Sequence, residues 1–163
     1  MNTTTADINF HELCEKLRSM KLSSMADTLE KQLANPNSGL QSFDERISEI
    51  ICSEWDTRYN KKFNRFLKKA TLKYPAADID ESIYDADRFL DTGTIERLAA
   101  CDWIDEGKNL LITGSTGSGK TYISNALCIS ALRLFHTVRY VKASTLIYEL
   151  EQAQVTGEYL NYT

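Results

Sequence analysis

The sequence is poor in residues that break regular structure or bind metals. Its 163 residues include two prolines, seven glycines and two histidines, which stand alone without ligand spacing. So few helix breakers favour a mainly helical chain. No apolar run approaches the roughly 20 residues of a membrane helix. The first ten residues also lack the basic and apolar segments of a secretory signal, so we expect a cytoplasmic protein without membrane contact.

Closely spaced cysteines are also lacking. The four cysteines, Cys14, Cys52, Cys101 and Cys128, are far apart and form no C-x-x-C pair. This spacing is typical of reduced thiols in a cytosolic protein, and it argues against a disulfide framework or a zinc site.

The charges are unevenly distributed along the chain. The net charge is −4, which argues weakly against a general coating of nucleic acid. Residues 54–74 carry seven basic and two acidic side chains, whereas residues 76–106 carry two basic and ten acidic ones. The contrast indicates either two surfaces with different partners or two solvated faces that offset each other.

Apolar spacing in the first half predicts helices separated by turns. We expect a helix over 7–20, a second helix opened by a capping box at 24–27, and a turn at 35–39. Ser42 and Glu45 form another capping box, which opens a long helix to Ala70 whose apolar stripe includes Trp55 as a core residue. We therefore predict an all-helical N-terminal domain over residues 1–75.

The period of the pattern changes in the second half. Residues 76–106 are read as an acidic linker with a short helix at 94–104, which contains Trp103 as a core residue and ends at Gly107. We then expect a strand at 109–113, a helix at 119–135, a strand at 138–141 and a helix at 144–154. This order predicts an α/β domain with a parallel sheet over residues 107–163.

A glycine-rich motif follows the first of these strands. It matches G-x-x-x-x-G-K-[ST], the phosphate-binding P-loop, where glycine amides, a helix N-terminus and a lysine hold a triphosphate and a hydroxyl binds Mg²⁺. We therefore predict ATP and Mg²⁺ as cofactors, with Thr121 as the Mg²⁺ ligand. The predicted ATP-binding residues are Gly114, Ser115, Thr116, Gly117, Ser118, Gly119, Lys120 and Thr121.

The sequence lacks the rest of a hydrolytic site. After Thr121 its only acidic residues are Glu149, Glu151 and Glu158, and none follows a short apolar strand. A P-loop ATPase needs such a carboxylate to place Mg²⁺ and the attacking water. We therefore identify no complete catalytic set, and we expect an incomplete ATPase domain that binds ATP with negligible turnover.

A basic stripe lies on the long predicted helix. Its members recur at helical spacing and fall on one face. Such a face suits the phosphate backbone of duplex DNA without reading its sequence. A solvated helix face, or a dock for an acidic protein surface, would explain it equally well. The residues are Arg58, Lys61, Lys62, Arg65, Lys68 and Lys69.

Several stretches together resemble one known family, the IstB-like ATPases. These proteins are transposition helpers of IS21-type insertion elements and are related to the DnaC helicase loaders. The resemblance covers nearly the whole chain, and it is more specific than the P-loop alone. It rests on 17–33, Ser42-Phe43-Asp44-Glu45-Arg46, Glu54-Trp55, Tyr74-Pro75-Ala76, 98–104, the P-loop with its preceding strand at 109–114, and 138–143.

The resemblance implies an AAA+ core of the initiator and helicase-loader type, ATP-dependent homo-oligomers, DNA binding and a transposase partner. It also implies a DNA-contacting helical insertion from about Ser144 toward Tyr162. The family's Walker B strand, sensor residues and arginine finger match nothing in this sequence, which indicates a truncated domain. The alternatives are a replicative helicase loader, with a helicase as partner, and a nucleotide- and DNA-binding module that does not hydrolyse ATP.

Overall fold

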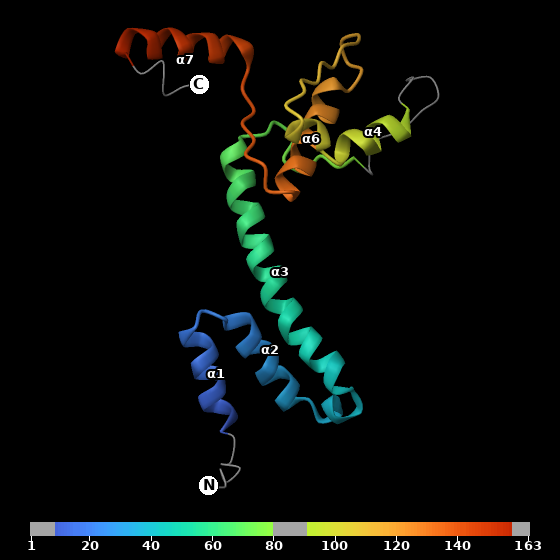
Figure 1. The fold of residues 1–163 in the computed structure, drawn as a ribbon, viewed down its shortest axis with the longest axis vertical. Coiled ribbons are helices and arrows are strands. Elements are labelled where there is room, and N and C mark those ends of the chain that lie inside the picture. The colour runs from blue at the N-terminus through green and yellow to red at the C-terminus, as the bar shows by residue number, and fades with distance from the viewer. Residues whose placement is uncertain (1–8, 80–90, 158–163) are drawn as a thin grey trace. The chain divides into compact units, whose positions relative to one another are not determined.

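A computed structural model describes residues 9–79 and 91–157, and the parts of the predicted elements at 1–8, 80–90 and 158–163 lie outside these ranges. The described residues form helices and connecting segments, and none of these helices is long and apolar enough to cross a membrane. The helices are α1 (Phe10–Ser19), α2 (Ser23–Ala34), the 3₁₀ helix η1 (Pro36–Leu40), α3 (Phe43–Ala70), α4 (Thr92–Ala99), α5 (Asp102–Asp105), α6 (Lys120–Arg133) and α7 (Ala143–Thr156) (Figure 1).

The chain divides into two compact units. Unit 1 comprises Met1–Lys62 and unit 2 comprises Phe63–Thr163, so the division falls within α3. The domain limits expected from the sequence, at residues 75 and 106, remain predictions. The long helix itself is confirmed from Phe43 to Ala70.

Unit 1 begins with a pair of helices, α1 and α2, that pack on each other. Cys14 of α1 and Ala26 of α2 are fully buried between them. Arg18 near the end of α1 donates to Asp27 at 3.1 Å and to Glu30 at 2.8 Å, both on α2. The Arg18 guanidinium is the main cause that lowers the pKa of Glu30.

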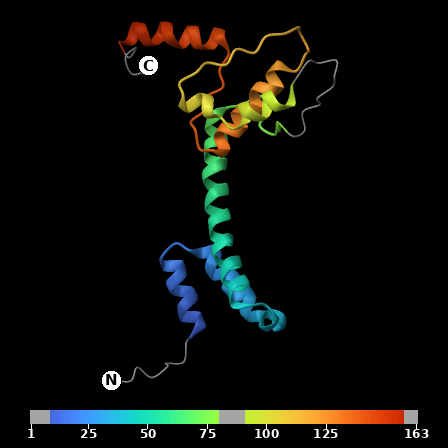
Figure 2. The same ribbon diagram turned by 45° about the vertical axis from the view of Figure 1, so that its right-hand side comes forward.

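Helix α2 lies along the first half of α3, as both views show (Figures 1 and 2). Polar side chains hold this contact. Gln32 of α2 is buried, and its amide donates to the Arg46 carbonyl at 3.0 Å and to Glu49 at 2.7 Å. Ser24 of α2 donates through its hydroxyl to Thr57 at 2.9 Å.

The start of α2 corrects one sequence prediction. The expected capping box at 24–27 does not form, because the N-cap is Leu22 and no side chain caps the helix from within. Instead, Glu54 of α3 accepts a hydrogen bond from the Ser24 amide at 3.0 Å. A carboxylate from another helix therefore stabilises this N-terminus, where an anion is favourable.

The start of α3 confirms the second capping box. Ser42 and Glu45 exchange hydrogen bonds, with the Glu45 amide donating to the Ser42 hydroxyl at 3.3 Å and the Ser42 amide donating to Glu45 at 2.8 Å. The expected burial of Trp55 is wrong, because 70% of its surface is exposed. The α2 contact takes the neighbouring face of α3, where Ile50 and Glu54 are buried.

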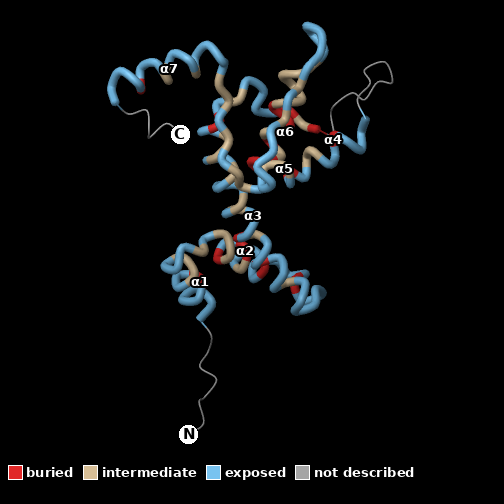
Figure 3. The backbone as a smooth tube through the Cα atoms, turned by 45° about the horizontal axis from the view of Figure 1, so that its top comes forward, coloured by how far each residue is buried: buried red, intermediate tan, exposed pale blue. Residues whose placement is uncertain are grey.

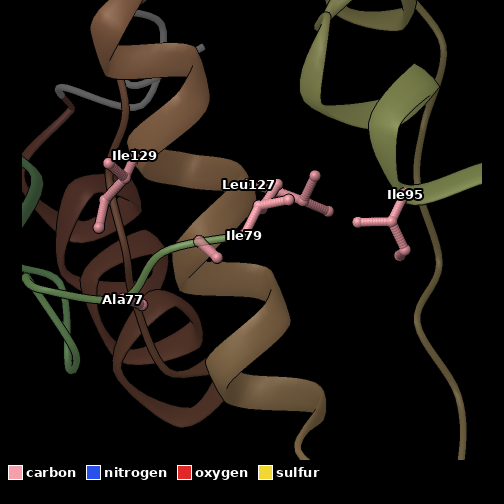
Figure 4. Packing of buried hydrophobic residues seen from close by; sticks show 6 residues of the cluster. Ala77, Ile79, Ile95, Leu127 and Ile129 are labelled. Carbon is pink, nitrogen blue, oxygen red and sulfur yellow. The ribbon is translucent and has the colours of Figure 1, made fainter. Parts of the chain in front are cut away.

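The core of unit 2 surrounds α6. Ala126, Leu127 and Ile129 of α6 are buried with Ala77 and Ile79 from the segment after α3 and Ile95 from α4. Figure 4 shows Ile95 pointing toward Leu127 across the gap between α4 and α6. The first residues of the expected linker, 77–79, are thus part of the core.

The helix expected at 94–104 is two helices. Helix α4 begins at Thr92, where Asp91 caps it by accepting from the Thr94 amide at 2.8 Å, and it ends at Ala99. Cys101 then adopts a left-handed conformation with φ of 66° before the short helix α5. Trp103 is half-buried, and its indole donates to the Leu98 carbonyl at 3.0 Å. The expected helix end at Gly107 is confirmed by its φ of +66°.

The described residues contain no β-strand. The expected α/β domain with a parallel sheet is therefore not confirmed by hydrogen bonds between strands. A strand is defined by a hydrogen-bonded neighbour. Segments 109–113 and 138–141 have none, although the Tyr140 amide donates to the Ala70 carbonyl at 2.9 Å. Burial nevertheless alternates along 109–113, with Leu110 and Ile112 half-buried and Leu111 86% exposed. This period of two is typical of an extended segment that covers a core with one face.

Candidate nucleotide-binding site

The loop at 114–119 joins the extended segment 109–113 to α6. Three of its residues are glycines with positive φ: +153° at Gly114, +82° at Gly117 and +87° at Gly119. Residues with a side chain rarely adopt such backbone conformations, whereas glycine adopts them at little cost. A Cβ on Gly114 would meet the Ser118 hydroxyl at 3.1 Å, so the curled loop leaves little room for a larger residue there.

The end of the loop presents a positive charge and the first amides of a helix. Lys120 is the first residue of α6, and its ammonium donates to the carbonyls of Gly114 at 2.9 Å and Ser115 at 2.6 Å. Gly119 is the N-cap, and it has no side chain to satisfy the first amides of α6. These amides and the helix dipole favour an anion at this position.

Helix α6 is fixed behind the loop by a residue that the sequence analysis missed. Asn125 is fully buried, accepts from the Tyr74 amide at 3.0 Å and donates to the Thr121 carbonyl at 2.7 Å. The Tyr122 hydroxyl accepts from the Asp78 amide at 3.2 Å. The signal that could have identified Asn125 is a polar residue within a helix that has an apolar face. A buried polar side chain requires a hydrogen-bond partner. Segment 74–79 therefore orients the helix that carries Lys120.

The geometry fits a chain of phosphates. The tight glycine turns, the uncapped helix start and the lysine ammonium supply donors and positive charge without protein anions in the loop itself. Thr121 is half-buried on the first turn of α6, where its hydroxyl could bind a cation held by the phosphates. Among the described residues no cluster of His, Cys, Asp or Glu could hold a metal ion alone, so a cation here would depend on bound phosphate.

The residues of the basic stripe all lie on α3 and are all exposed. Its two arginines interact with groups of the protein itself. Arg58 donates to Glu54 at 2.7 Å and to the Lys21 carbonyl at 3.0 Å, and Arg65 lies over the Phe66 ring at 5.6 Å. Arg58 therefore has a structural role in unit 1, whatever else it binds.

Lys69 lines an open hollow in unit 2 with a volume of about 670 Å³. Arg139 and Lys142 line the same hollow, although the sequence analysis did not group them with the stripe. Arg139 forms an ion pair with Glu149 of α7, whereas Lys142 is exposed. The fold therefore adds cations from a distant part of the sequence to one end of the stripe.

A second, more apolar cavity of about 370 Å³ lies behind the extended segments. Leu110, Ile112 and Val138 line it, together with Leu127 and Cys128 of α6. Burial raises the pKa of the Cys128 thiol, which disfavours its thiolate form. All four cysteines are free.

A glycine-rich loop that opens a helix with a lysine is typical of the P-loop class of nucleotide-binding proteins. The family described as "IstB-like ATP binding protein" matches residues 15–162. The chain belongs to this family, which implies the fold of a P-loop nucleoside triphosphatase.

Individual relatives support the same assignment. The ATP-binding protein of insertion sequence IS1162 from Pseudomonas fluorescens is 36% identical over 88% of this chain and 62% of its own length. An insertion sequence ATP-binding protein from Sinorhizobium fredii is 32% identical over 91% of this chain and 60% of its length. One from Mycobacterium tuberculosis is 30% identical over 82% and 53%. The chain therefore spans less than two thirds of the length of these relatives.

Proposed function

We propose that this chain binds Mg²⁺-ATP at residues 114–121 and serves as a helper protein in transposition, acting on DNA with a transposase. The main support for the nucleotide site is the conformation of the loop. Its glycines have positive φ, and the Lys120 ammonium donates hydrogen bonds to its carbonyls. The names of the relatives, which refer to insertion sequences, favour a transposase over a replicative helicase as partner.

The nucleotide site is tested by replacing Lys120. The Lys120→Ala variant cannot form a charge-assisted hydrogen bond to phosphate, so ATP affinity should fall by about 1.5–3 kcal/mol. Isothermal titration calorimetry with Mg²⁺-ATP measures this decrease. Lys108→Ala is the matched control, because Lys108 is an exposed lysine of the same unit outside the loop. Equal affinity in the wild type and Lys120→Ala would contradict the proposal.

DNA binding is the second part of the proposal. The basic stripe on α3 is exposed, and Lys69 shares a hollow with Lys142. The family resemblance implies a DNA-contacting insertion from about Ser144 toward Tyr162. The part of it that the structure describes is a weaker candidate for DNA binding than the basic stripe. Helix α7 carries Glu149 and Glu151 and has no basic residue, so the helix itself supplies no positive charge for phosphate.

Charge reversal tests the DNA interface. The variant with Lys68→Glu, Lys69→Glu and Lys142→Glu should bind duplex DNA of any sequence more weakly. The slope of log K against log salt should decrease by about 0.9 for each phosphate group that the variant no longer neutralises. Fluorescence anisotropy at several salt concentrations measures both quantities.

The control for this variant carries the same charge change at Lys16, Lys31 and Lys108, which are exposed lysines outside the stripe. Its net charge equals that of the test variant, so a general charge effect would appear in both. An equal decrease in DNA affinity in both variants would contradict a local DNA interface.

A further inference from the structure

The hollow in unit 2 has a positively charged lining that comes from distant parts of the chain. Its volume is about 670 Å³, and its three cations are Lys69, Arg139 and Lys142. Within the described part of the chain, Glu149 supplies the one carboxylate of this lining, and Arg139 forms an ion pair with it. Thr137 and Thr145 add exposed hydroxyl groups. Cations and hydroxyl donors together are the groups that proteins present to the phosphates and sugars of nucleic acids.

Hydrogen bonds hold the two sides of the hollow together. The Tyr140 amide donates to the Ala70 carbonyl at 2.9 Å, and the Thr71 hydroxyl donates to the Tyr140 carbonyl at 3.2 Å. Ala70 and Thr71 directly follow Lys69, so these bonds fix the end of α3 beside the extended segment 137–142. The cluster of cations is therefore built into the fold of unit 2.

The hollow differs in shape from the part of the basic stripe that lies in unit 2. Arg65 and Lys68 are exposed on the last turns of α3 and are not among the described residues that line the hollow. Duplex DNA is wide, with a major groove of about 12 Å, and it can lie across an exposed helix face. A volume of about 670 Å³ is instead typical of a pocket for a small molecule. The nucleotides of one strand fit into such a hollow, whereas a duplex does not.

We propose that unit 2 prefers DNA in which a duplex continues into a single strand. This rests on the DNA-binding part of the proposed function and adds the form of the DNA. The duplex phosphates contact Arg65 and Lys68, and the single strand enters the hollow, where Arg139 binds its backbone. Glu149 competes with the strand for Arg139, because its carboxylate forms an ion pair with that guanidinium.

Fluorescence anisotropy of the whole chain tests this preference with three DNAs. They are a blunt duplex, the same duplex with an oligothymidine extension, and oligothymidine alone. For the wild type, the extension should raise the affinity of the duplex at least fivefold. Arg139→Gln should remove most of this gain, because the hollow loses a cation, and it should leave the affinity for the blunt duplex within twofold.

Glu149→Gln is the matched control, because it breaks the same ion pair and leaves the arginine in place. This variant should keep the gain from the extension or increase it, since the competing carboxylate is removed. A merely structural role of the ion pair would instead reduce the gain in both variants. Circular dichroism checks that both variants keep their helices.

Four outcomes would overturn the preference for a single-stranded extension. They are equal affinity of the wild type for the blunt and extended duplexes, loss of the gain in both variants, an unchanged gain in Arg139→Gln, and an equal loss of affinity for both duplexes in Arg139→Gln. Displacement of the extended duplex by an oligoaspartate peptide as effectively as by oligothymidine would assign the hollow to an acidic protein and would also overturn it. Binding of the blunt duplex without any gain leaves the proposed function intact, whereas no binding of any of the three DNAs overturns both.

Discussion

Glu54 shows how much one residue can contribute to a small helical unit. Its carboxylate accepts from the Ser24 amide at the start of α2 and from Arg58, and the residue is buried. Replacing it by glutamine keeps the size but removes the charge. We expect Glu54→Gln to lower the free energy of unfolding by about 1–2 kcal/mol, as measured by urea denaturation. Asp56→Asn is the control, because Asp56 is exposed on the same helix.

The same residue predicts a pH dependence. The hydrogen bond from Arg58 lowers the pKa of Glu54 below its ordinary value, despite the opposing effect of burial. A lowered pKa in the folded state means that this stabilisation is present above the ordinary pKa and is lost as the pH falls through the folded pKa. The stability difference between the wild type and Glu54→Gln should therefore shrink in acid. A difference that stays constant down to about pH 3 would contradict this explanation.

At the scale of elements, the helix that carries Lys120 depends on one buried amide. Asn125 connects α6 to Tyr74, and without it the Tyr74 amide and the Thr121 carbonyl lose a hydrogen-bond partner. We expect Asn125→Ala to lower the free energy of unfolding by about 1–3 kcal/mol, because buried polar groups are costly to leave unpaired.

Thermal denaturation of Asn125→Ala and of Ser124→Ala checks this prediction. Ser124 donates to the Lys120 carbonyl of its own helix, so its replacement should cost much less. Similar stability of the two variants would show that the hydrogen bond to Tyr74 does not orient α6. ATP affinity should fall with Asn125→Ala in the same samples, because the loop and Lys120 follow the position of α6.

Helix α7 differs from α6 in how little of it is packed. Ala153 is the one residue of α7 that is buried in the described part of the chain, whereas six residues of α6 are (Figure 3). An ion pair between Arg139 and Glu149 connects α7 to the preceding segment. Buried side chains therefore hold α6 in place more firmly than α7.

At the scale of the whole molecule, the 163-residue chain should bind ATP with negligible turnover. The acidic residues after Thr121 are few, and Glu149 is already paired with Arg139. A P-loop ATPase positions Mg²⁺ and the attacking water with a carboxylate, and we expect neither to be positioned by these few acidic residues. A phosphate-release assay should give the same rate for the wild type and for Lys120→Ala. A rate well above buffer that the substitution abolishes would contradict this prediction.

The sequence alone determined the features that depend on neighbouring residues. The long helix, its capping box at Ser42 and the helix end at Gly107 follow from local hydrogen bonding and from backbone preferences within a few residues. The helix after the glycine-rich loop was predictable for the same reason. The family assignment also came from the sequence, because it rests on the order of short motifs.

Only the tertiary structure decided which helix faces are covered. Trp55 belongs to an apolar stripe by spacing, but α2 packs on the neighbouring face and leaves it exposed. Glu54 and Asn125 gained their roles from partners 30 and 51 residues away. Strand pairing likewise depends on distant segments. The pattern therefore identified the apolar runs at 109–113 and 138–141, but it could not identify the segments beside which they lie. Spacing along a chain fixes local geometry, whereas burial depends on what packs against it.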